Sequence, residues 1–122
     1  MTHLGELETA VMEEVWRRRQ VTVRDVQTAL NARTPRERAY TTVMTVMTRL
    51  CDKGMLVRTR RGRRDVYRPT GSRDAWLQES ARAGVDALVE EFGDLALAHF
   101  SRQVAALDPE RREALRKLAE DA

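Results

Sequence analysis

The sequence predicts a mainly α-helical chain that is interrupted by one short β-hairpin. Apolar residues recur every three or four positions through residues 4–16, 23–32 and 42–53, which is the spacing of helices with one buried face. The pattern then changes to short β-type runs on either side of Gly62, which predicts a two-stranded hairpin. Helical spacing returns after Pro69 and continues towards the C-terminus.

The first expected helix, Glu6–Arg18, ends in arginines, whose charges interact favourably with the carboxyl end of the helix dipole. A short extended segment, Val21–Val23, follows it. Thr22 and Asp25 match a capping box, in which a hydroxyl and a carboxylate three residues apart satisfy free N–H groups at a helix start. The sequence therefore predicts a second helix that continues to about Ala32.

A third helix is expected after a polar connection, Arg33–Arg38. Thr41 or Thr42 can serve as its N-cap, and it should run to Lys53 because Gly54 is a usual C-terminal stop. The stripe expected to face the core comprises Val43, Val46, Met47 and Leu50. The opposite face carries several threonines, which are poor helix formers, so we predict a binding role for that face.

Two short strands are expected at Met55–Thr59 and Asp65–Arg68. The segment between them, Arg60–Arg64, has one glycine among four arginines and is typical of a hairpin turn. Four guanidinium groups so close together repel one another without an anionic partner, and each can form a forked contact with a phosphate. The hairpin tip is therefore expected to contact phosphate groups.

The last third of the chain is expected to form about three helices. Ser72 and Asp74 suit a helix start, and apolar residues then recur at near-heptad spacing until Gly93 interrupts them. A further helix is expected over Leu97–Leu107. Asp108, which is followed by proline and glutamate, marks the start of a closing helix, because aspartate is a good N-cap and proline fits the first turn.

The expected domains are residues 1–72 and 73–122, and charge follows this division. Residues 1–73 carry 16 basic and 8 acidic side chains (net +8), whereas residues 74–122 carry 6 basic and 11 acidic side chains (net −5). A basic half suits a polyanion as its partner. Some 50 residues rarely sustain a core alone, so the C-terminal helices should pack on the first domain or, as we favour, on a second copy.

The composition argues against several classes of protein. The two histidines, His3 and His99, lie far apart in sequence, and Cys51 is the single cysteine. The scattered histidines and the single cysteine offer no metal site, and the isolated glycines form no phosphate-binding loop. The sequence therefore predicts no enzyme activity, no cofactor and no metal. No run approaches the ~18 apolar residues of a membrane span, and the N-terminus lacks the pattern of a secretory signal. A cytoplasmic protein is therefore expected, and a lone cysteine suits that reducing compartment.

Helix, short strand, helix, helix, hairpin is the order of a winged helix-turn-helix. In this fold the third helix enters the major groove of DNA, and the hairpin, or wing, lies against the backbone or the minor groove. Threonine can contact phosphates, bases or the thymine methyl, and arginine can contact guanine or phosphate. The residues expected to bind DNA are Arg24, Arg38, Tyr40, Thr41, Thr42, Thr45, Arg49, Arg60, Arg61, Arg63 and Arg64.

Self-association is expected to use the apolar stripes of the C-terminal helices, because a two-fold dimer presents two reading helices to a palindromic site. The residues expected at the dimer interface are Leu77, Ala81, Val85, Leu88, Phe92, Leu97, Phe100, Val104, Leu115 and Leu118. Two alternatives remain open. The winged helix could be a protein-interaction module, or the chain could be a ligand-responsive regulator with a pocket lined by Trp76, Leu77, Phe92 and Phe100.

Three segments are distinctive in combination: residues 4–16, residues 21–26 and Tyr40–Leu50, followed by Lys53-Gly54 and the wing-like Tyr67-Arg68-Pro69. Together they resemble the penicillinase-repressor family of the BlaI, MecI and CopY type. The resemblance implies a homodimeric repressor, often of β-lactamase or stress genes. It also implies operators that are inverted repeats with TACA/TGTA-like half-sites, read by the third helix.

The resemblance also implies how such a repressor is released. Many family members are inactivated when a membrane sensor protease signals a cut in the C-terminal region, at an Asn-Phe bond in the best-known cases. His99-Phe100 falls at the matching place, with histidine where asparagine is expected. Copper-sensing relatives carry a C-terminal Cys-x-Cys pair, which this chain lacks, so release by copper is not expected.

Overall fold

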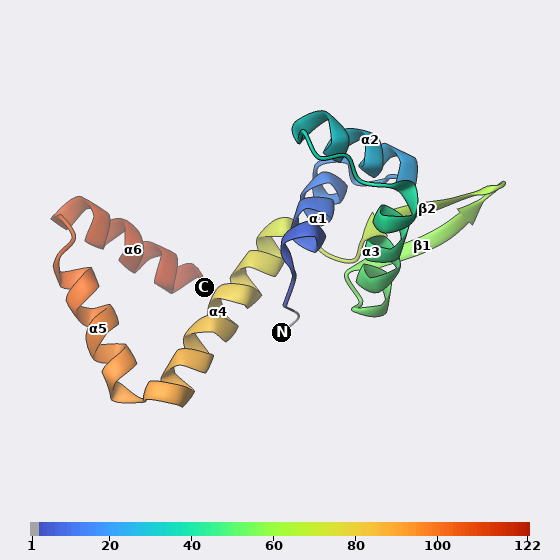
Figure 1. The fold of residues 1–122 in the computed structure, drawn as a ribbon. Coiled ribbons are helices and arrows are strands. Elements are labelled where there is room, and N and C mark those ends of the chain that lie inside the picture. The colour runs from blue at the N-terminus through green and yellow to red at the C-terminus, as the bar shows by residue number, and fades with distance from the viewer. Residues whose placement is uncertain (1–2) are drawn as a thin grey trace. The chain divides into compact units, whose positions relative to one another are not determined.

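A computed structural model of the chain describes residues 3–122 (Figure 1). These residues form two compact units, which divide between Trp76 and Leu77. Helices dominate both units, and the one sheet among the described residues is a two-stranded antiparallel hairpin. The mainly helical fold with a hairpin that the sequence predicts is thus confirmed.

The N-terminal unit is a winged helix-turn-helix. Three helices come first, α1 (Glu6–Arg18), α2 (Val23–Arg33) and α3 (Tyr40–Asp52). The strands β1 (Leu56–Arg61) and β2 (Arg64–Pro69) follow and pair in antiparallel register. This is the element order of that fold, in which the hairpin is called the wing.

The predicted extended segment between α1 and α2 ties the wing to the helices. Val21 forms a β-bridge with Tyr67 of β2, with N···O distances of 3.0 and 2.7 Å. The side chain of Tyr67 is buried, and this burial raises the pKa of its hydroxyl, although the Arg58 guanidinium opposes the rise. Tyr67 is therefore a neutral anchor that holds the wing against the helical core.

The core of this unit is mainly aliphatic, as the low aromatic content predicts. The stripe expected on the third helix is buried, and side chains from α1, α2 and the wing complete the cluster. Its buried members are Leu4, Val11, Met12, Val15, Val21, Val23, Val26, Leu30, Val43, Val46, Met47, Leu50, Leu56 and Tyr67. Burial of each larger side chain contributes about 1.5–3 kcal/mol. This packing fixes α3 relative to the wing.

The predicted N-cap of the third helix was wrong, although the helix begins near the predicted place. The helix begins at Tyr40, and its N-cap is Ala39, which makes no side-chain capping bond. Thr41 and Thr42 therefore lie in the first turn and do not cap it. The physical reason is that polar side chains of α2 already hold the backbone of Arg38, which fixes where the chain enters the helix.

The predicted five-residue hairpin turn was also too long. Both strands extend further than expected, so that Arg61 pairs with Arg64 and only Gly62 and Arg63 form the turn. Gly62 has a φ of 64°, a value that residues with a side chain rarely adopt. A two-residue turn with glycine at its first position matches the twist of paired strands, which explains the tighter geometry.

Local capping signals in the sequence were otherwise reliable. Thr22 and Asp25 form the predicted capping box, with N···O distances of 3.1 and 2.9 Å. Ser72 accepts a backbone hydrogen bond of 3.0 Å at the start of the fourth helix. Asp108 accepts one of 2.8 Å from the N–H of Arg111 and caps the last helix. Each such cap contributes about 1 kcal/mol.

Glu14 is a fully buried carboxylate that the helical pattern did not predict. Its oxygens lie 2.5 Å from Arg17 Nη2, 3.4 Å from Arg18 Nε and 2.6 Å from Arg33 Nη2. A buried carboxylate is tolerated only when it is paired, so these contacts offset its desolvation. Because Arg33 belongs to α2, the cluster joins the C-terminal ends of α1 and α2.

The C-terminal unit consists of helices with no strand among residues 77–122. The helices are α4 (Arg73–Phe92), whose first four residues belong to the N-terminal unit, α5 (Asp94–Ala105) and α6 (Pro109–Asp121). Gly93 separates α4 from α5 with a φ of 60°, at the predicted break. The helix expected over Leu97–Leu107 starts earlier, directly after this glycine, and ends before Leu107.

Candidate nucleic-acid interface

One face of α3 is apolar and buried, and the other is free to contact a ligand. The exposed side chains of α3 that face away from the core include Tyr40, Thr41, Thr42, Met44, Thr45 and Arg49. The hydroxyl of Thr45 donates a 2.9 Å hydrogen bond to the Thr41 carbonyl within the helix. This bond occupies the hydroxyl proton, so Thr45 offers its methyl group and an oxygen acceptor outward.

The segment that leads into α3 is held by the second helix. The Asn31 Oδ1 accepts a 2.7 Å hydrogen bond from the N–H of Arg38. The side-chain amides of Gln27 and Asn31 each donate a 3.2 Å bond to the Arg38 carbonyl. With its backbone satisfied in this way, Arg38 is held in place immediately before the exposed helix.

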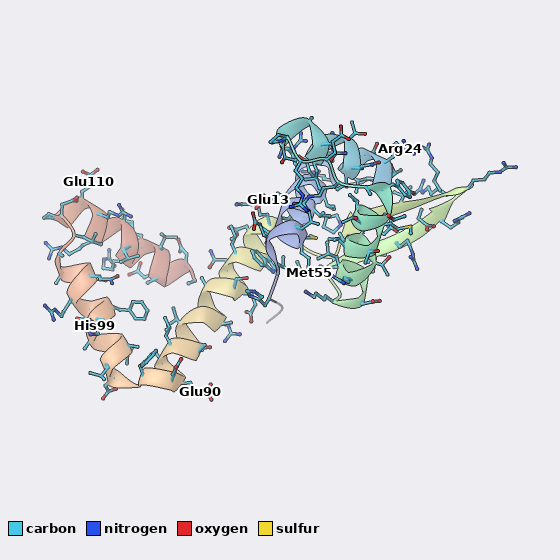
Figure 2. The ribbon with its side chains drawn as sticks, viewed as in Figure 1. Glu13, Arg24, Met55, Glu90, His99 and Glu110 are labelled. Carbon is cyan, nitrogen blue, oxygen red and sulfur yellow. The ribbon has the colours of Figure 1, made fainter. Side chains whose placement is uncertain are left out.

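A cation–π contact joins α2 to the start of α3. The guanidinium carbon of Arg24 lies 5.5 Å from the centroid of the Tyr40 ring. Figure 2 labels Arg24 near the N-terminal end of α2, and both residues border the same groove. Such contacts at exposed sites contribute about 0.5–1 kcal/mol, enough to restrict where the arginine points.

The wing carries positive charge that has few internal partners. Asp65 lies 3.4 Å from Arg60, its direct neighbour across the strands. Arg61 and Arg64 lie opposite each other, and Arg63 is in the turn. Within residues 3–122, these three arginines have no carboxylate within 4.0 Å, and all are exposed. Like charges in such positions favour the approach of an anion.

A groove of about 440 Å³ lies between the first turn of α2, the start of α3 and the wing. It brings together several of the residues expected to bind DNA, and its lining includes Arg24, Tyr40, Met44, Arg60, Arg63 and Arg64. Arg61 lines a neighbouring hollow of about 280 Å³. Thr41, Thr42, Thr45 and Arg49 lie on α3 outside this groove, and Arg38 is not among its lining residues.

Two of the lining residues to which sequence reasoning gave no binding role are Met44 and Asp65. Met44 is 41% exposed on α3, although its apolar character suggested no outward role. Its position between Thr41 and Thr45 on the exposed face of the helix could have indicated it. Asp65 was expected only as a strand residue, yet its pairing with Arg60 reduces the free positive charge at the wing.

The C-terminal unit exposes most of its large apolar side chains. No side chain in residues 77–122 is buried, and Phe92 and Leu95 are 51% and 67% exposed. The remaining exposed apolar side chains that the sequence placed at a dimer interface are Leu77, Ala81, Val85, Leu88, Leu97, Val104, Leu115 and Leu118. Phe100 is half-buried, and Leu95 was not anticipated. A hollow of about 400 Å³ between α4 and α5 is almost wholly apolar.

The remaining reactive side chains form no second centre. Cys51 packs at the edge of the core, and burial raises the pKa of its thiol, which therefore stays protonated. Residues 3–122 contain no cluster of three His, Cys, Asp or Glu side chains able to hold a metal ion. None of the helices in this range combines the length and the apolar composition that crossing a bilayer requires.

The comparisons with known proteins agree with this geometry. A family model described as penicillinase repressor matches residues 4–121. The chain belongs to the penicillinase repressor family. Members of this family are transcriptional repressors and not enzymes. The resemblance that the first, second and third helices carry in sequence is thereby confirmed.

Individual relatives are similar over most of the chain. Two proteins described as transcriptional regulator BlaI, from two strains of Mycobacterium tuberculosis, are each 44% identical to it. The alignments cover 96% of this chain and 83% of each relative. A solution structure of the DNA-binding domain of the repressor BlaI is 25% identical, with a TM-score of 0.51. That alignment covers 58% of this chain and 84% of the domain.

Proposed function

We propose that this penicillinase-repressor family member represses transcription by binding a palindromic operator as a homodimer in the cytoplasm. The observation that carries the proposal is one groove that places Tyr40 and Met44 of α3 beside arginines of the wing. The relatives described as transcriptional regulators and the neighbouring DNA-binding domain support it. Repression would be steric, because a dimer seated on a promoter blocks polymerase.

In this proposal the exposed face of α3 reads bases in the major groove. Thr41, Thr42 and Thr45 supply hydroxyl oxygens and methyl groups, and a methyl group can contact that of thymine. Arg49, near the C-terminal end of the helix, can reach a guanine edge or a phosphate. These contacts provide specificity, at about 1–3 kcal/mol for each good base contact.

The wing and the helix ends supply affinity that does not depend on sequence. Arg60, Arg61, Arg63 and Arg64 would contact phosphates of the backbone, and Arg60 would do so less strongly because it is paired with Asp65. Arg24, steadied by Tyr40, would extend this contact on the other side of the groove, and Arg38, whose backbone is held by α2 just before α3, would add a further phosphate contact. We expect about four phosphates neutralised per protomer.

Dimerisation through the C-terminal helices completes the proposal. Within residues 3–122, twelve large apolar side chains are exposed, and nine of them lie beyond residue 76. An exposed apolar surface of this kind marks an interaction site in soluble proteins. We infer that a second copy of the chain covers this surface, because a two-fold dimer matches the symmetry of a palindromic operator.

Release by proteolysis at His99-Phe100 is part of the proposal, with a membrane sensor protease as the partner that triggers it. Figure 2 labels His99 on α5, and both residues lie inside this helix. A protease requires an extended substrate, so cleavage there needs local unwinding. The cut would fall within α5 and would separate the residues after His99, with their part of the dimer surface, from the winged helix.

The decisive experiment is a binding titration of the full chain with DNA from its own upstream region, followed by fluorescence anisotropy at several salt concentrations. About eight phosphates per dimer predict a slope of log affinity against log salt of about −7. Arg63→Ala should weaken binding to operator and random DNA alike. A slope near zero, or no preference for any promoter sequence, would overturn the proposal in favour of a protein-interaction module.

A further inference from the structure

One concavity of the N-terminal unit has no residue of α3 or of the wing tip in its lining. It has a volume of about 780 Å³, within the range of small-molecule sites. Its lining comes from the ends of α1, α2 and β2 and from the start of α4: Glu13, Trp16, Arg17, Arg19, Arg33, Arg68, Pro69, Gly71, Ser72 and Arg73. We propose that this concavity binds a small organic anion with an aromatic body.

The charge of the concavity is only partly compensated. Of its five arginines, Arg17 and Arg33 pair with the buried Glu14, and Arg73 lies 2.9 Å from Glu13. Within residues 3–122, the other two arginines have no carboxylate partner within 4.0 Å; these are Arg19 and Arg68. Two unpaired guanidinium groups beside one hollow suit a carboxylate, sulfonate or phosphate, which can accept forked hydrogen bonds.

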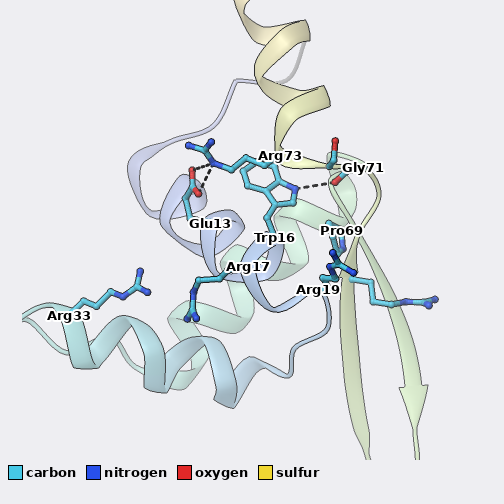
Figure 3. A pocket seen from close by; sticks show the side chains of 10 residues that line it. Glu13, Trp16, Arg17, Arg19, Arg33, Pro69, Gly71 and Arg73 are labelled. Carbon is cyan, nitrogen blue, oxygen red and sulfur yellow. Dashed lines mark hydrogen bonds and ion pairs between the residues drawn. The ribbon is translucent and has the colours of Figure 1, made fainter.

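An aromatic surface lies beside these charges. Trp16 donates a 3.1 Å hydrogen bond from its indole N–H to the Gly71 carbonyl, as Figure 3 shows. Its ring packs against Trp76, with 5.6 Å between ring centroids and a 42° tilt. With its polar atom satisfied and its orientation fixed, Trp16 offers a rigid apolar face to an aromatic ligand. Pro69 adds to this apolar lining.

The backbone of Arg19 gives an independent reason to assign a role to its side chain. Within residues 3–122, Arg19 is the single non-glycine residue with a positive φ, 71°. Its N–H donates a 2.6 Å hydrogen bond to the Val15 carbonyl and closes α1. Glycine fits this position without steric cost. An arginine that occupies a strained position is a mark of a functional site.

The position of the concavity gives the ligand a regulatory role, and this step rests on the proposed function. Gly71 and Ser72 belong to the connection between β2 and α4, and Arg73 is the first residue of α4. The Trp16–Gly71 bond and the Arg73–Glu13 pair tie this connection to α1 (Figure 3). An anion bound here competes for these contacts, and so acts on the link that leads from the reading unit to the dimer helices.

The test uses the full chain labelled with ¹⁵N, without DNA, and naphthalene-2-carboxylate as the probe. The indole N–H signals of Trp16 and Trp76 report the site in an NMR titration. We expect a saturable shift of the Trp16 signal with a half-saturation below about 1 mM, and binding about tenfold weaker for the neutral naphthalene-2-carboxamide. The absence of saturation, or equal binding of both probes, would overturn the proposal.

Variants separate a ligand site from a structural or DNA-binding role. Arg19→Gly relieves the positive φ, so it should leave the fold at least as stable, yet it should weaken probe binding about tenfold. Arg68→Gln should do the same, whereas Arg64→Gln at the wing should leave probe binding unchanged. If Arg19→Gly or Arg68→Gln instead keeps full probe affinity and weakens DNA binding as Arg64→Gln does, these arginines serve the DNA backbone and the proposal fails. Because the titration contains no DNA, its outcome does not depend on operator binding.

Discussion

At the scale of single residues, the internal hydrogen bond of Thr45 decides what this side chain can offer to DNA. Its hydroxyl proton is directed to the Thr41 carbonyl, 2.9 Å away. If α3 reads thymine through the methyl group, Thr45→Val should keep operator preference and Thr45→Ser should lose about 1–3 kcal/mol of it. Anisotropy titrations with operator and scrambled DNA measure this preference. The opposite order of the two variants would identify the hydroxyl oxygen as the reading group.

Single residues also mark where sequence reasoning reached its limit. The apolar stripe of the third helix could be predicted because helical spacing alone places Val43, Val46 and Leu50 on one face. The burial of Glu14 could not be predicted, because a carboxylate in an amphipathic helix is normally interpreted as surface charge. Its partner Arg33 is nineteen residues away in the sequence, and only the structure shows their contact. Met44 was missed because its apolar side chain suggests burial, although its position between Thr41 and Thr45 on the exposed face could have indicated it.

At the scale of elements, the start of α3 lacks a side-chain cap, so a substitution that supplies one should stabilise the protein. Ala39 has the extended backbone of an N-cap (φ −71°, ψ 152°) but cannot accept a hydrogen bond through its side chain. Ala39→Ser should raise the free energy of unfolding by about 0.5–1 kcal/mol. Urea denaturation followed by tryptophan fluorescence measures it. Ala32→Ser, inside α2, is the matched control and should lower stability slightly; an equal rise in both would refute the capping account.

An ion pair between two elements makes the stability of the N-terminal unit depend on pH. Lys53 Nζ, just after α3, lies 2.8–2.9 Å from both carboxylate oxygens of Glu8 in α1. The hydrogen bond from Lys53, followed by that from the Gly5 N–H, lowers the pKa of Glu8. Because the folded pKa is below the unfolded value of about 4.3, this stabilisation is complete above that pH and is lost as the pH falls through the folded pKa.

Lys53→Met should therefore destabilise the chain near pH 7 and cost progressively less as the pH falls below about 4. Urea midpoints measured by tryptophan fluorescence across this range give the difference between variant and parent. Lys117→Met on α6 is the control, because Lys117 has no carboxylate within 4.0 Å among residues 3–122 and its removal should leave the midpoint curve unchanged. A constant difference at every pH would show that Lys53 acts through packing and not through the ion pair.

Elements could be predicted wherever the signal is local. The capping box of α2 and the glycine break before α5 were found because neighbouring side chains decide them. The start of α3 and the length of the wing turn were not, because contacts across the unit set both. Asn31 fixes the backbone before α3 from another helix, and pairing of Arg61 with Arg64 tightens the turn.

At the scale of the whole molecule, the buried core lies in one unit and the exposed apolar faces lie mostly in the other. The N-terminal unit holds the buried residues of the chain, whereas residues 77–122 hold none. Pairs such as Arg82 with Glu79 and Asp86 lie along one helix, are exposed and contribute little. Helices without a core of their own gain stability by covering their apolar faces. The proposed association therefore depends on the apolar faces of the acidic half, and the proposed DNA contacts lie in the basic half.

Substitution on that apolar face should therefore separate assembly from folding. Leu88→Glu places a charge at the apolar hollow between α4 and α5, where no residue is buried within the single chain. The winged helix should remain folded, and the molar mass from light scattering should fall from twice the 14.0 kDa of one chain to a single chain. Affinity for a full palindrome should drop by about a hundredfold, because the second reading helix is no longer tethered, while affinity for one half-site should not change.

Ser101→Glu, exposed on α5 and outside the hollow, is the matched control and should stay dimeric. A Leu88→Glu protein that kept its mass and its palindrome affinity would place the dimer contact elsewhere.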